Sequence, residues 1–299
     1  MRKLTQVGIY SGILGGFLFD DVQVLKPAIP WLLGALLFFN FSRIDFYFKR
    51  KDFSRLLWFP LFCLGLLPFL TSIFLQGMGE NFRAGIFLIS ISPVAIASPV
   101  IADFIHADRR LVALGLFLYN LLAPLIYPLL IHWHLKGQEI TVPPSQIFGL
   151  ALLVGLPLVL SLLTKKLKQC SILVNQAGRY AGPGIFILVI MIAMGAAKKY
   201  LVNKPAQELF FLALAVFSLA ILLYVSGFFL GKLSGVPRST ALFFGHKNSG
   251  LALWVALAFF HEEAILPIIL YIISHHVING FLMQIWHKHP GSESAESPH

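Results

Sequence analysis

A lysine lies at the centre of one of the most apolar stretches of the chain. Thr240–Phe260 reads TALFFGHKNSGLALWVALAFF, and its middle holds four polar residues in a row, His246, Lys247, Asn248 and Ser249. A lysine at the centre of a membrane helix costs about 2.5–3.5 kcal/mol on insertion scales, so Lys247 needs polar partners or a function. A buried ammonium can bind an anion, stand in for a metal cation or carry a proton. A purely structural role, as a tie between helices, is the alternative.

Two further stretches place polar or helix-breaking residues inside apolar sequence. Ser92–Val100 reads SPVAIASPV, and Ser274–Trp286 reads SHHVINGFLMQIW. Together the three stretches supply the residues that we expect at a substrate site: Pro93, Ser98, Pro99, His246, Asn248, Ser249, His275 and His276. His246 and His275 are also candidate proton carriers. For His275 and His276, a satisfied hydrogen bond between helices is an equally good interpretation, and His246 could instead simply face a polar cavity.

Four other polar residues lie within or beside the apolar sequence. Asp103 and His106 follow the Ser92–Val100 stretch near the end of its segment. Asp103 is a third candidate proton carrier, with a solvent-exposed role left open, and His106 is expected to be exposed. Asn120 and Asn279 are expected to make hydrogen bonds between helices.

The composition is that of a chain that crosses a membrane many times. Of its 299 residues, 58% are apolar and 12% are charged, and the mean hydropathy is +0.81. Soluble domains carry about 25% charged residues. The net charge of +10 comes from short basic clusters between apolar runs, which is typical of membrane loops and not of a nucleic-acid-binding face. Cys63 and Cys170 form neither a disulfide framework nor a metal-site pattern, and we expect no metal and no cofactor other than protons.

Ten apolar segments are each long enough for a membrane helix. They lie near residues 4–19, 27–42, 54–76, 80–106, 109–134, 143–167, 180–200, 206–232, 236–260 and 262–286. We therefore expect an all-α polytopic membrane protein with ten transmembrane helices. The first segment follows Arg2 and Lys3 as in a signal peptide, but no small-residue cleavage site follows, so we expect it to be retained.

The basic residues are divided unevenly between the two ends of these segments. If both termini lie on the same side of the membrane, that side holds 16 lysines and arginines and the opposite side holds 6. Lys247, inside a segment, is the remaining one of the 23 lysines and arginines of the chain. The positive-inside rule then puts both termini in the cytoplasm and the chain in the plasma or inner membrane. The polar residues 288–299 are expected to form a disordered cytoplasmic tail.

The segments divide into two halves of five, residues 1–142 and 143–287. Because five is odd, the halves must insert in opposite orientations, as the inverted repeats of secondary transporters do. Adding 153 to Pro93 and to Pro99 gives positions 246 and 252, so the two helix-breaking stretches lie at matching places in the halves. Backbone groups freed by such breaks are tolerated only where they line a cavity, which predicts a site near the membrane midplane.

Three stretches resemble the bile acid:sodium symporter family: NSGLA at Asn248–Ala252, the proline-containing Ser92–Val100, and Ser274–Trp286. The number and order of segments agree with this resemblance over nearly the whole chain. It implies a panel domain of spans 1, 2, 6 and 7 and a core domain of spans 3–5 and 8–10, in which the broken spans 4 and 9 cross. It also implies that an amphipathic or small organic anion binds beside the crossing, near His275, and that the two domains move against each other in alternating access.

The same resemblance shows which sodium ligands are missing. Sodium-coupled members carry an acidic residue and a glutamine where this chain has Phe243 and Lys247, and an asparagine at the position of Pro99. Serine or threonine ligands of the family fall near Val112 and Leu116. Because sodium binds oxygen atoms, we expect sodium-independent transport, with Lys247 as the coupling cation in place of the ion and proton coupling as a further option.

Other classes of protein are less well supported. The sequence has no HExxH, no GxGD-type aspartate pair and no GxSxG serine in a membrane helix, so an enzyme is not expected. It also lacks a repeated pore loop or a charged ring of the kind that channels use. We expect a secondary active transporter of organic anions, either bile-acid-like or small carboxylates, that acts as a monomer without nucleic-acid partners. The alternatives are an auxin-efflux-like anion carrier or uniporter, and a non-transporting membrane sensor.

Overall fold

The computed structural model describes residues 2–44, 50–74, 76–134 and 144–287, and over these residues the chain is all-helical. No β-strand forms in this part of the chain, although Val94 and Lys247 make an isolated antiparallel bridge. The predicted tail at 288–299 and the predicted boundary between the halves at 142–143 lie outside the described residues.

The helices follow one another through short connections. In chain order they are α1 (Arg2–Leu18), the 3₁₀-helix η1 (Asp20–Ala28), α2 (Ile29–Phe41), α3 (Arg50–Leu56), the π-helix η2 (Pro60–Leu66), α4 (Leu67–Phe74), α5 (Glu80–Ile91), α6 (Ser98–Phe104), α7 (Arg109–His134), α8 (Pro144–Lys166), α9 (Lys168–Asn203), α10 (Ala206–Leu233), α11 (Pro237–Gly245), α12 (Ser249–Phe259), the 3₁₀-helix η3 (Glu262–Ala264) and α13 (Ile265–His287).

Seven helical runs of the described chain are long and apolar enough to cross a membrane. They are Asp21–Phe41, Arg50–Thr71, Arg109–Trp133, Phe148–Lys166, Lys168–Asn203, Ala206–Leu233 and Glu262–Trp286. The sequence predicted ten segments, and the other three are shorter as helices. The first is α1, with 17 residues, and the fourth and ninth are each divided by a break, into α5 with α6 and α11 with α12. Neither half of a divided segment reaches the ~20 residues that cross the hydrocarbon core alone.

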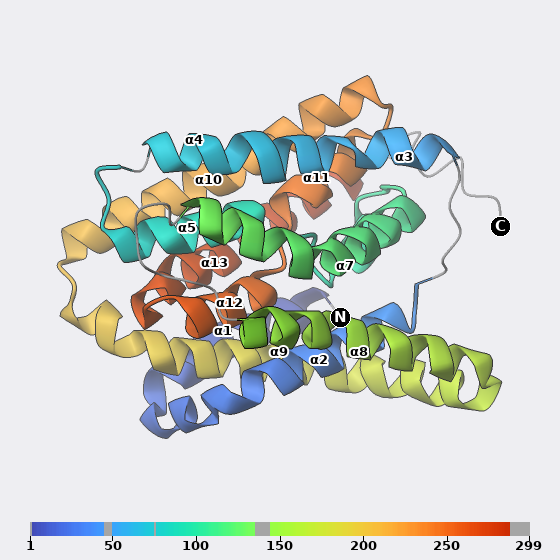
Figure 1. Cartoon of the computed structure of the whole chain (residues 1–299), viewed down its shortest axis with the longest axis horizontal. Coiled ribbons are helices and arrows are strands. Elements are labelled where there is room, and N and C mark those ends of the chain that lie inside the picture. The colour runs from blue at the N-terminus through green and yellow to red at the C-terminus, as the bar shows by residue number, and fades with distance from the viewer. Residues whose placement is uncertain (1, 45–49, 75, 135–143, 288–299) are drawn as a thin grey trace.

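The helices pack as two groups (Figure 1). In the first group, α1 packs along α9, and α2 packs against both α8 and α9. In the second group, α10 packs on α11 and α13, α5 packs on α4 and α13, and α7 packs on α6 and α11. The groups meet where α7 contacts α8, where α12 contacts α2 and α9, and where α13 contacts α9. Each group therefore combines helices from the first and the second half of the chain.

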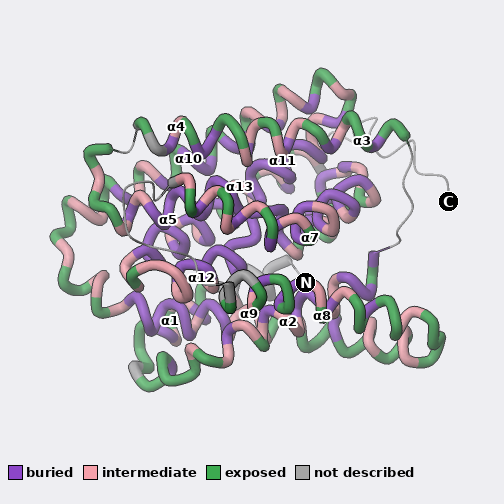
Figure 2. The backbone as a smooth tube through the Cα atoms, viewed as in Figure 1, coloured by how far each residue is buried: buried purple, intermediate pink, exposed green. Residues whose placement is uncertain are grey.

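Burial is concentrated in the second group (Figure 2). Most of α5 and all of Ser239–Gly245 in α11 are buried, whereas α8 carries exposed leucines such as Leu160 and Leu163. Large apolar side chains also lie exposed on α7, at Leu125 and Leu129. Helices that are apolar on their outer faces suit contact with lipid chains. The buried helices are those that carry the predicted breaks.

Two glycines let α10 approach α11 closely. A Cβ atom at Gly227 would lie 2.6 Å from the carbonyl oxygen of Thr240, and one at Gly231 would lie 2.6 Å from the Cα atom of Pro237. Small residues four apart are a common way for membrane helices to bring their backbones together. This contact holds α11, whose carboxyl end leads directly into the polar stretch around Lys247.

Candidate functional site

Both predicted helix breaks are present. α5 ends at Ile91 because Ser92 is extended (φ −61°, ψ 137°), the conformation that the residue before a proline favours. Pro93 itself has no N–H group to continue the helix. In the second break α11 ends at Gly245 and α12 begins at Ser249.

The backbones of the two breaks bind each other. The N–H group of Ala95 donates to the carbonyl oxygen of His246 at 2.7 Å. The N–H group of Asn248 donates to the carbonyl oxygen of Pro93 at 2.8 Å. These bonds make the isolated antiparallel bridge. The breaks leave backbone N–H and C=O groups without helical hydrogen bonds. These groups find partners inside the protein, which is required where water does not reach them.

Two asparagines fix this arrangement from the side. Asn120 of α7 donates to the carbonyl oxygens of Val94 at 3.0 Å and of Leu116 at 2.7 Å. Asn248 donates to the Asn120 side-chain oxygen at 2.7 Å, and it also caps α12 by accepting from the N–H group of Leu251 at 3.2 Å. The predicted interhelical hydrogen bonds of Asn120 are confirmed. They connect three segments at the crossing of the breaks.

Lys247 is 1% exposed, and its ammonium donates to the carbonyl oxygen of Ser90 at 3.1 Å. It also lies 4.6 Å from the centre of the Phe59 ring and interacts with the Cys63 thiol. If the ammonium replaces a bound cation, the sequence predicts that it reaches oxygens of the other break, around Ala95–Ser98, and this prediction is wrong. The last carbonyls of α5 lack helical partners and form the negative end of its dipole, so Ser90 is the better acceptor.

The Phe59 ring and the Cys63 thiol were not predicted from the sequence. They lie on a span in which the α-helix gives way to a π-helix, Pro60–Leu66. A π-helical turn is wider than an α-helical one, is rare, and occurs frequently at functional sites. The signal in the sequence was Pro60 inside an apolar run, because a proline in a helix interior disturbs the hydrogen-bond ladder.

Apolar side chains fill three of the positions that the resemblance assigns to sodium ligands, Phe243, Val112 and Leu116. Phe243 is fully buried and lies edge-on to Tyr119, with ring centres 6.4 Å apart. A Cβ atom at Gly115 would lie 2.7 Å from the Phe243 ring, so the ring occupies the space that this glycine leaves. Val112 and Leu116 lie on the same helix as Gly115, α7, and both are apolar and buried.

The predicted histidines form one cluster beside the bridge. His246 shares a hydrogen bond of 2.9 Å with the hydroxyl of Ser98. Its ring centre lies 4.9 Å from that of His275 and 6.2 Å from that of His276. His276 also contacts Phe186 of α9, with ring centres 6.4 Å apart. The cluster therefore lies where the two helix groups meet.

His275 stands out because it is 1% exposed and neither of its ring nitrogens has a hydrogen-bond partner in the described chain. The amide nitrogen of Asn279 is likewise buried without a partner, while its oxygen accepts from Tyr224 at 2.6 Å, which confirms the predicted interhelical bond. An unsatisfied buried polar group costs about 1–3 kcal/mol. Such groups call for an explanation, and a bound ligand is one.

The remaining predicted residues divide into two sets. Pro99 lies in the first turn of α6, and the buried hydroxyl of Ser249 donates to the carbonyl oxygen of Lys247 at 3.4 Å. Asp103, in contrast, is exposed and pairs with Arg109 at 3.0 Å, and His106 takes a positive φ of 53° just after α6. The structure thus brings every predicted site residue to the crossing except Asp103.

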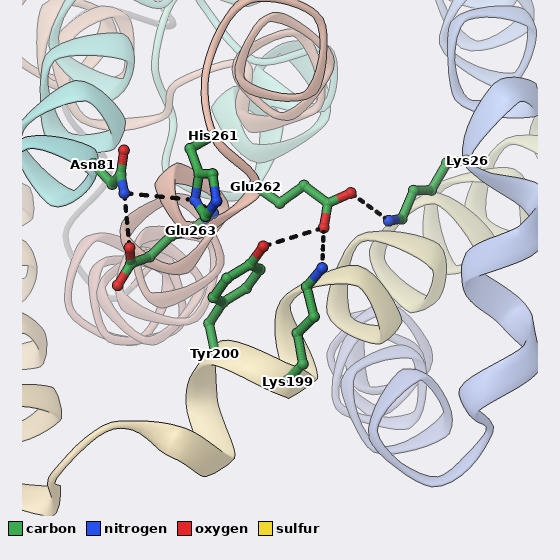
Figure 3. Close-up of polar contacts among 7 residues, drawn as sticks. All are labelled: Lys26, Asn81, Lys199, Tyr200, His261, Glu262 and Glu263. Atoms are coloured by element: carbon green, nitrogen blue, oxygen red, sulfur yellow. Dashed lines mark hydrogen bonds and ion pairs between the residues drawn. The ribbon is translucent and has the colours of Figure 1, made fainter.

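A second group of polar side chains joins the two helix groups at the start of η3 (Figure 3). Glu262 pairs with Lys26 of η1 at 2.6 Å and with Lys199 of α9 at 2.9 Å. Tyr200 donates to the same carboxylate at 3.5 Å. We call Lys26, Lys199, Tyr200 and Glu262 the Glu262 cluster. None of its members was singled out in the sequence, where they lie at or near the ends of separate apolar segments.

Glu263 extends these contacts along η3. It accepts from the amide of Asn81 at 2.7 Å and pairs with Lys204 at 2.6 Å. The hydrogen bond to the Glu263 carboxylate raises the pKa of Lys204 above its ordinary value. Lys204 also pairs with Glu208 of α10 at 3.1 Å. The connections before α5, α10 and α13 are thereby joined at one end of the molecule.

Comparison with known proteins assigns the chain to a family. The model of the SBF-like CPA transporter family, which is of the bile acid:sodium symporter type, matches residues 50–288. The chain belongs to that family. It is also 25% identical over 223 residues to YocS of Bacillus subtilis (strain 168), whose name describes it as an uncharacterized sodium-dependent transporter. The match covers 71% of this chain and 67% of that protein. Membership of this family, together with the apolar helices, identifies the chain as a multi-pass membrane protein of transporter type.

Proposed function

We propose that this protein is a secondary active transporter of organic anions and that the bridged helix breaks form its substrate site. Two observations carry the proposal: the ammonium of Lys247 is buried, and the ring of buried His275, 4.9 Å from that of His246 between ring centres, has no hydrogen-bond partner among the described residues. Charge-assisted bonds from an ammonium and from imidazole N–H groups are well suited to a carboxylate. A bile-acid-like molecule and a small carboxylate both carry that group.

The proposed architecture is ten spans in two inverted repeats. α1, α2, α8 and α9 would form the panel domain and the remaining helices the core domain, a division supported by how these helices pack. The bias of basic residues supports cytoplasmic termini in the plasma or inner membrane. In alternating access the domains move against each other, so the Glu262 cluster, which joins them, would break and re-form in each cycle.

Transport is proposed to be independent of sodium. The buried side chains of Phe243, Val112 and Leu116 support sodium independence, since none of them offers an oxygen atom to a metal ion. Lys247 would serve as a built-in coupling cation, and it or a histidine of the cluster would exchange protons. The sodium dependence in the name of the Bacillus subtilis relative therefore does not carry over to this chain in our proposal.

Uptake into proteoliposomes tests the proposal, with labelled cholate and pyruvate as probes of the two anion classes. We expect uptake of one of them that is unchanged when choline replaces sodium and that responds to a pH step. A tenfold loss of affinity without sodium, equivalent to about 1.4 kcal/mol of coupling, would contradict sodium independence. Uptake without a pH response would favour the auxin-efflux-like uniporter, and binding without uptake would favour the sensor.

A further inference from the structure

Two buried polar side chains of α13 keep hydrogen-bonding groups without a partner. Both ring nitrogens of His275 and the amide nitrogen of Asn279 have no hydrogen-bond partner among the described residues, and the two residues are 1% and 2% exposed. Polar neighbours on the same helix differ, because the side chains of Ser274 and His276 each bond a backbone carbonyl oxygen one turn earlier, at 2.8 and 2.7 Å. The unpartnered groups are therefore not a general property of this helix.

His275 and Asn279 lie on one face of α13, because residues four apart in a helix are neighbours on its surface. Side chains at this spacing have Cβ atoms about 5–6 Å apart, so one small group can reach both. Asn279 is oriented by Tyr224 of α10, whose hydroxyl donates to the amide oxygen at 2.6 Å. This bond leaves the amide N–H groups to donate elsewhere.

The backbone at Gly245 fixes two tyrosines around this face of α13. A Cβ atom at Gly245 would overlap the Tyr224 ring, so the ring packs directly on the glycine. Tyr271 donates to the carbonyl oxygen of Gly245 at 2.7 Å, and its ring centre lies 5.3 Å from that of His275. Because Gly245 directly precedes His246, the unpartnered groups are held at the second helix break, next to the histidine cluster.

The donors and acceptors of the two side chains define the group that would satisfy them. A neutral imidazole has one N–H donor and one acceptor nitrogen, whereas the amide nitrogen of Asn279 has donors only. A charged His275 would be a buried cation with no acidic partner among the described residues, which is unfavourable. A hydroxyl group can donate to the acceptor nitrogen of His275 and accept from Asn279, while a carboxylate or carbonyl oxygen can only accept. One hydroxyl therefore satisfies both side chains and leaves the imidazole N–H for a carboxylate oxygen.

We propose that His275 and Asn279 form a subsite for a hydroxyl group and that the transported anion is a hydroxylated carboxylate. This inference rests on the proposed function, since it adds a second point of recognition to the same substrate. The ring centre of His275 lies 4.3 Å from that of His276, which contacts Phe186 of α9, so the subsite is beside the boundary between the two helix groups. An analogue without the hydroxyl leaves the buried groups unpaired, which is why sites of this kind discriminate strongly.

Thermal unfolding of the purified full chain in lipid nanodiscs tests the proposal with two pairs of anions. Lactate is compared with pyruvate, which has a carbonyl in place of the hydroxyl, and cholate with cholanoate, which has the same skeleton without hydroxyl groups. In at least one pair, the concentration dependence of Tm should show that the hydroxylated anion binds at least tenfold more tightly. Equal or weaker binding of the hydroxylated anion in both pairs would overturn the subsite but not the proposed function. Binding of none of the four anions would contradict both.

Variants test whether these side chains cause the preference. Asn279→Leu removes the amide donors at similar volume, so binding of the hydroxylated anion should fall at least tenfold while that of its paired analogue changes less than twofold. Asn279→Leu with Tyr224→Phe, which also removes the hydroxyl left without an acceptor, should behave alike and guards against a loss of folding. Ser274→Ala, whose hydroxyl is already bonded to the backbone, should keep the preference. An equal loss for both anions of a pair, or a preference that survives without Asn279, would overturn the proposal.

Discussion

Lysines are held in two contrasting ways at the two polar regions of this protein. In the Glu262 cluster, Lys26 and Lys199 face a carboxylate, and their side chains are 24% and 56% exposed. At the crossing, Lys247 is buried and is held by a carbonyl oxygen and an aromatic ring, with no carboxylate partner among the described residues. Exposed ion pairs are each worth about 0–1 kcal/mol, while an uncompensated buried charge is strongly destabilising.

This difference suits the two roles that the proposed function gives to these regions. In the proposed cycle, contacts between the two domains break, so several weak, water-accessible ion pairs are suited to that place. A cation at the proposed substrate site must stay where it is without being neutralised by a permanent carboxylate, because the substrate is expected to supply the negative charge. The comparison can therefore be tested by removing a charge from each region.

The largest effect is expected from Lys247→Met. The substitution keeps much of the side-chain volume and removes the buried charge, so the protein should stay folded while anion uptake falls at least 100-fold, about 2.7 kcal/mol. Uptake and the melting temperature in the same vesicles measure both effects. Lys166→Met, at an exposed position, should leave both unchanged. Wild-type uptake in Lys247→Met would show that the lysine is only a structural tie.

His275→Phe should separate function from stability. Removing two buried nitrogens without partners should stabilise the protein by up to about 1–3 kcal/mol, because their desolvation is no longer uncompensated. Anion uptake should fall at least tenfold if these nitrogens bind substrate. Thermal unfolding and uptake are the two measurements, with His132→Phe, an exposed position, as the matched control. A variant that loses both stability and uptake would mean that His275 has a structural partner.

Glu262→Gln should act on domain contact and not on the substrate site. It weakens the ion pairs with Lys26 and Lys199, whose side chains are 24% and 56% exposed, so we expect a small loss of stability. Hydrogen exchange should rise several-fold in peptides that cover η1, η3 and the end of α9. Glu208→Gln, which weakens an ion pair with Lys204 alone, should leave η1 unaffected. Unchanged exchange in η1 would show that the cluster does not hold the domains together.

The smallest effect is expected from salt. Raising the ionic strength from about 0.1 M to about 1 M shortens the screening length from ~10 Å to ~3 Å, which weakens exposed pairs and hardly affects buried ones. Exchange should increase in peptides around Glu262 and stay constant in peptides around Lys247. Equal changes in both regions would contradict the contrast in burial on which the comparison is based.

The sequence by itself determined the membrane class, the positions of the apolar segments and the two helix breaks. These features are local: a proline removes a backbone donor wherever it lies, and an apolar run of sufficient length partitions into lipid whatever its neighbours are. Asn248 and His275 were also identified from the sequence, because polar residues are conspicuous inside apolar segments. The same reasoning left Asp103 open between a proton carrier and an exposed residue, and the structure places it at an exposed position, paired with Arg109.

Only the tertiary structure decided which groups those residues meet. Ser90 replaced Ala95–Ser98 as the acceptor for Lys247 because the carbonyl end of α5 faces the second break. The Phe59 ring arrives from a different span, and its place depends on the π-helix that follows it. The Glu262 cluster unites side chains of η1, the end of α9 and η3, which are far apart in the chain, as the separation of Tyr200 and Glu262 by 62 positions illustrates. Partners of this kind follow from the packing of whole helices, and no local pattern in the chain contains that information.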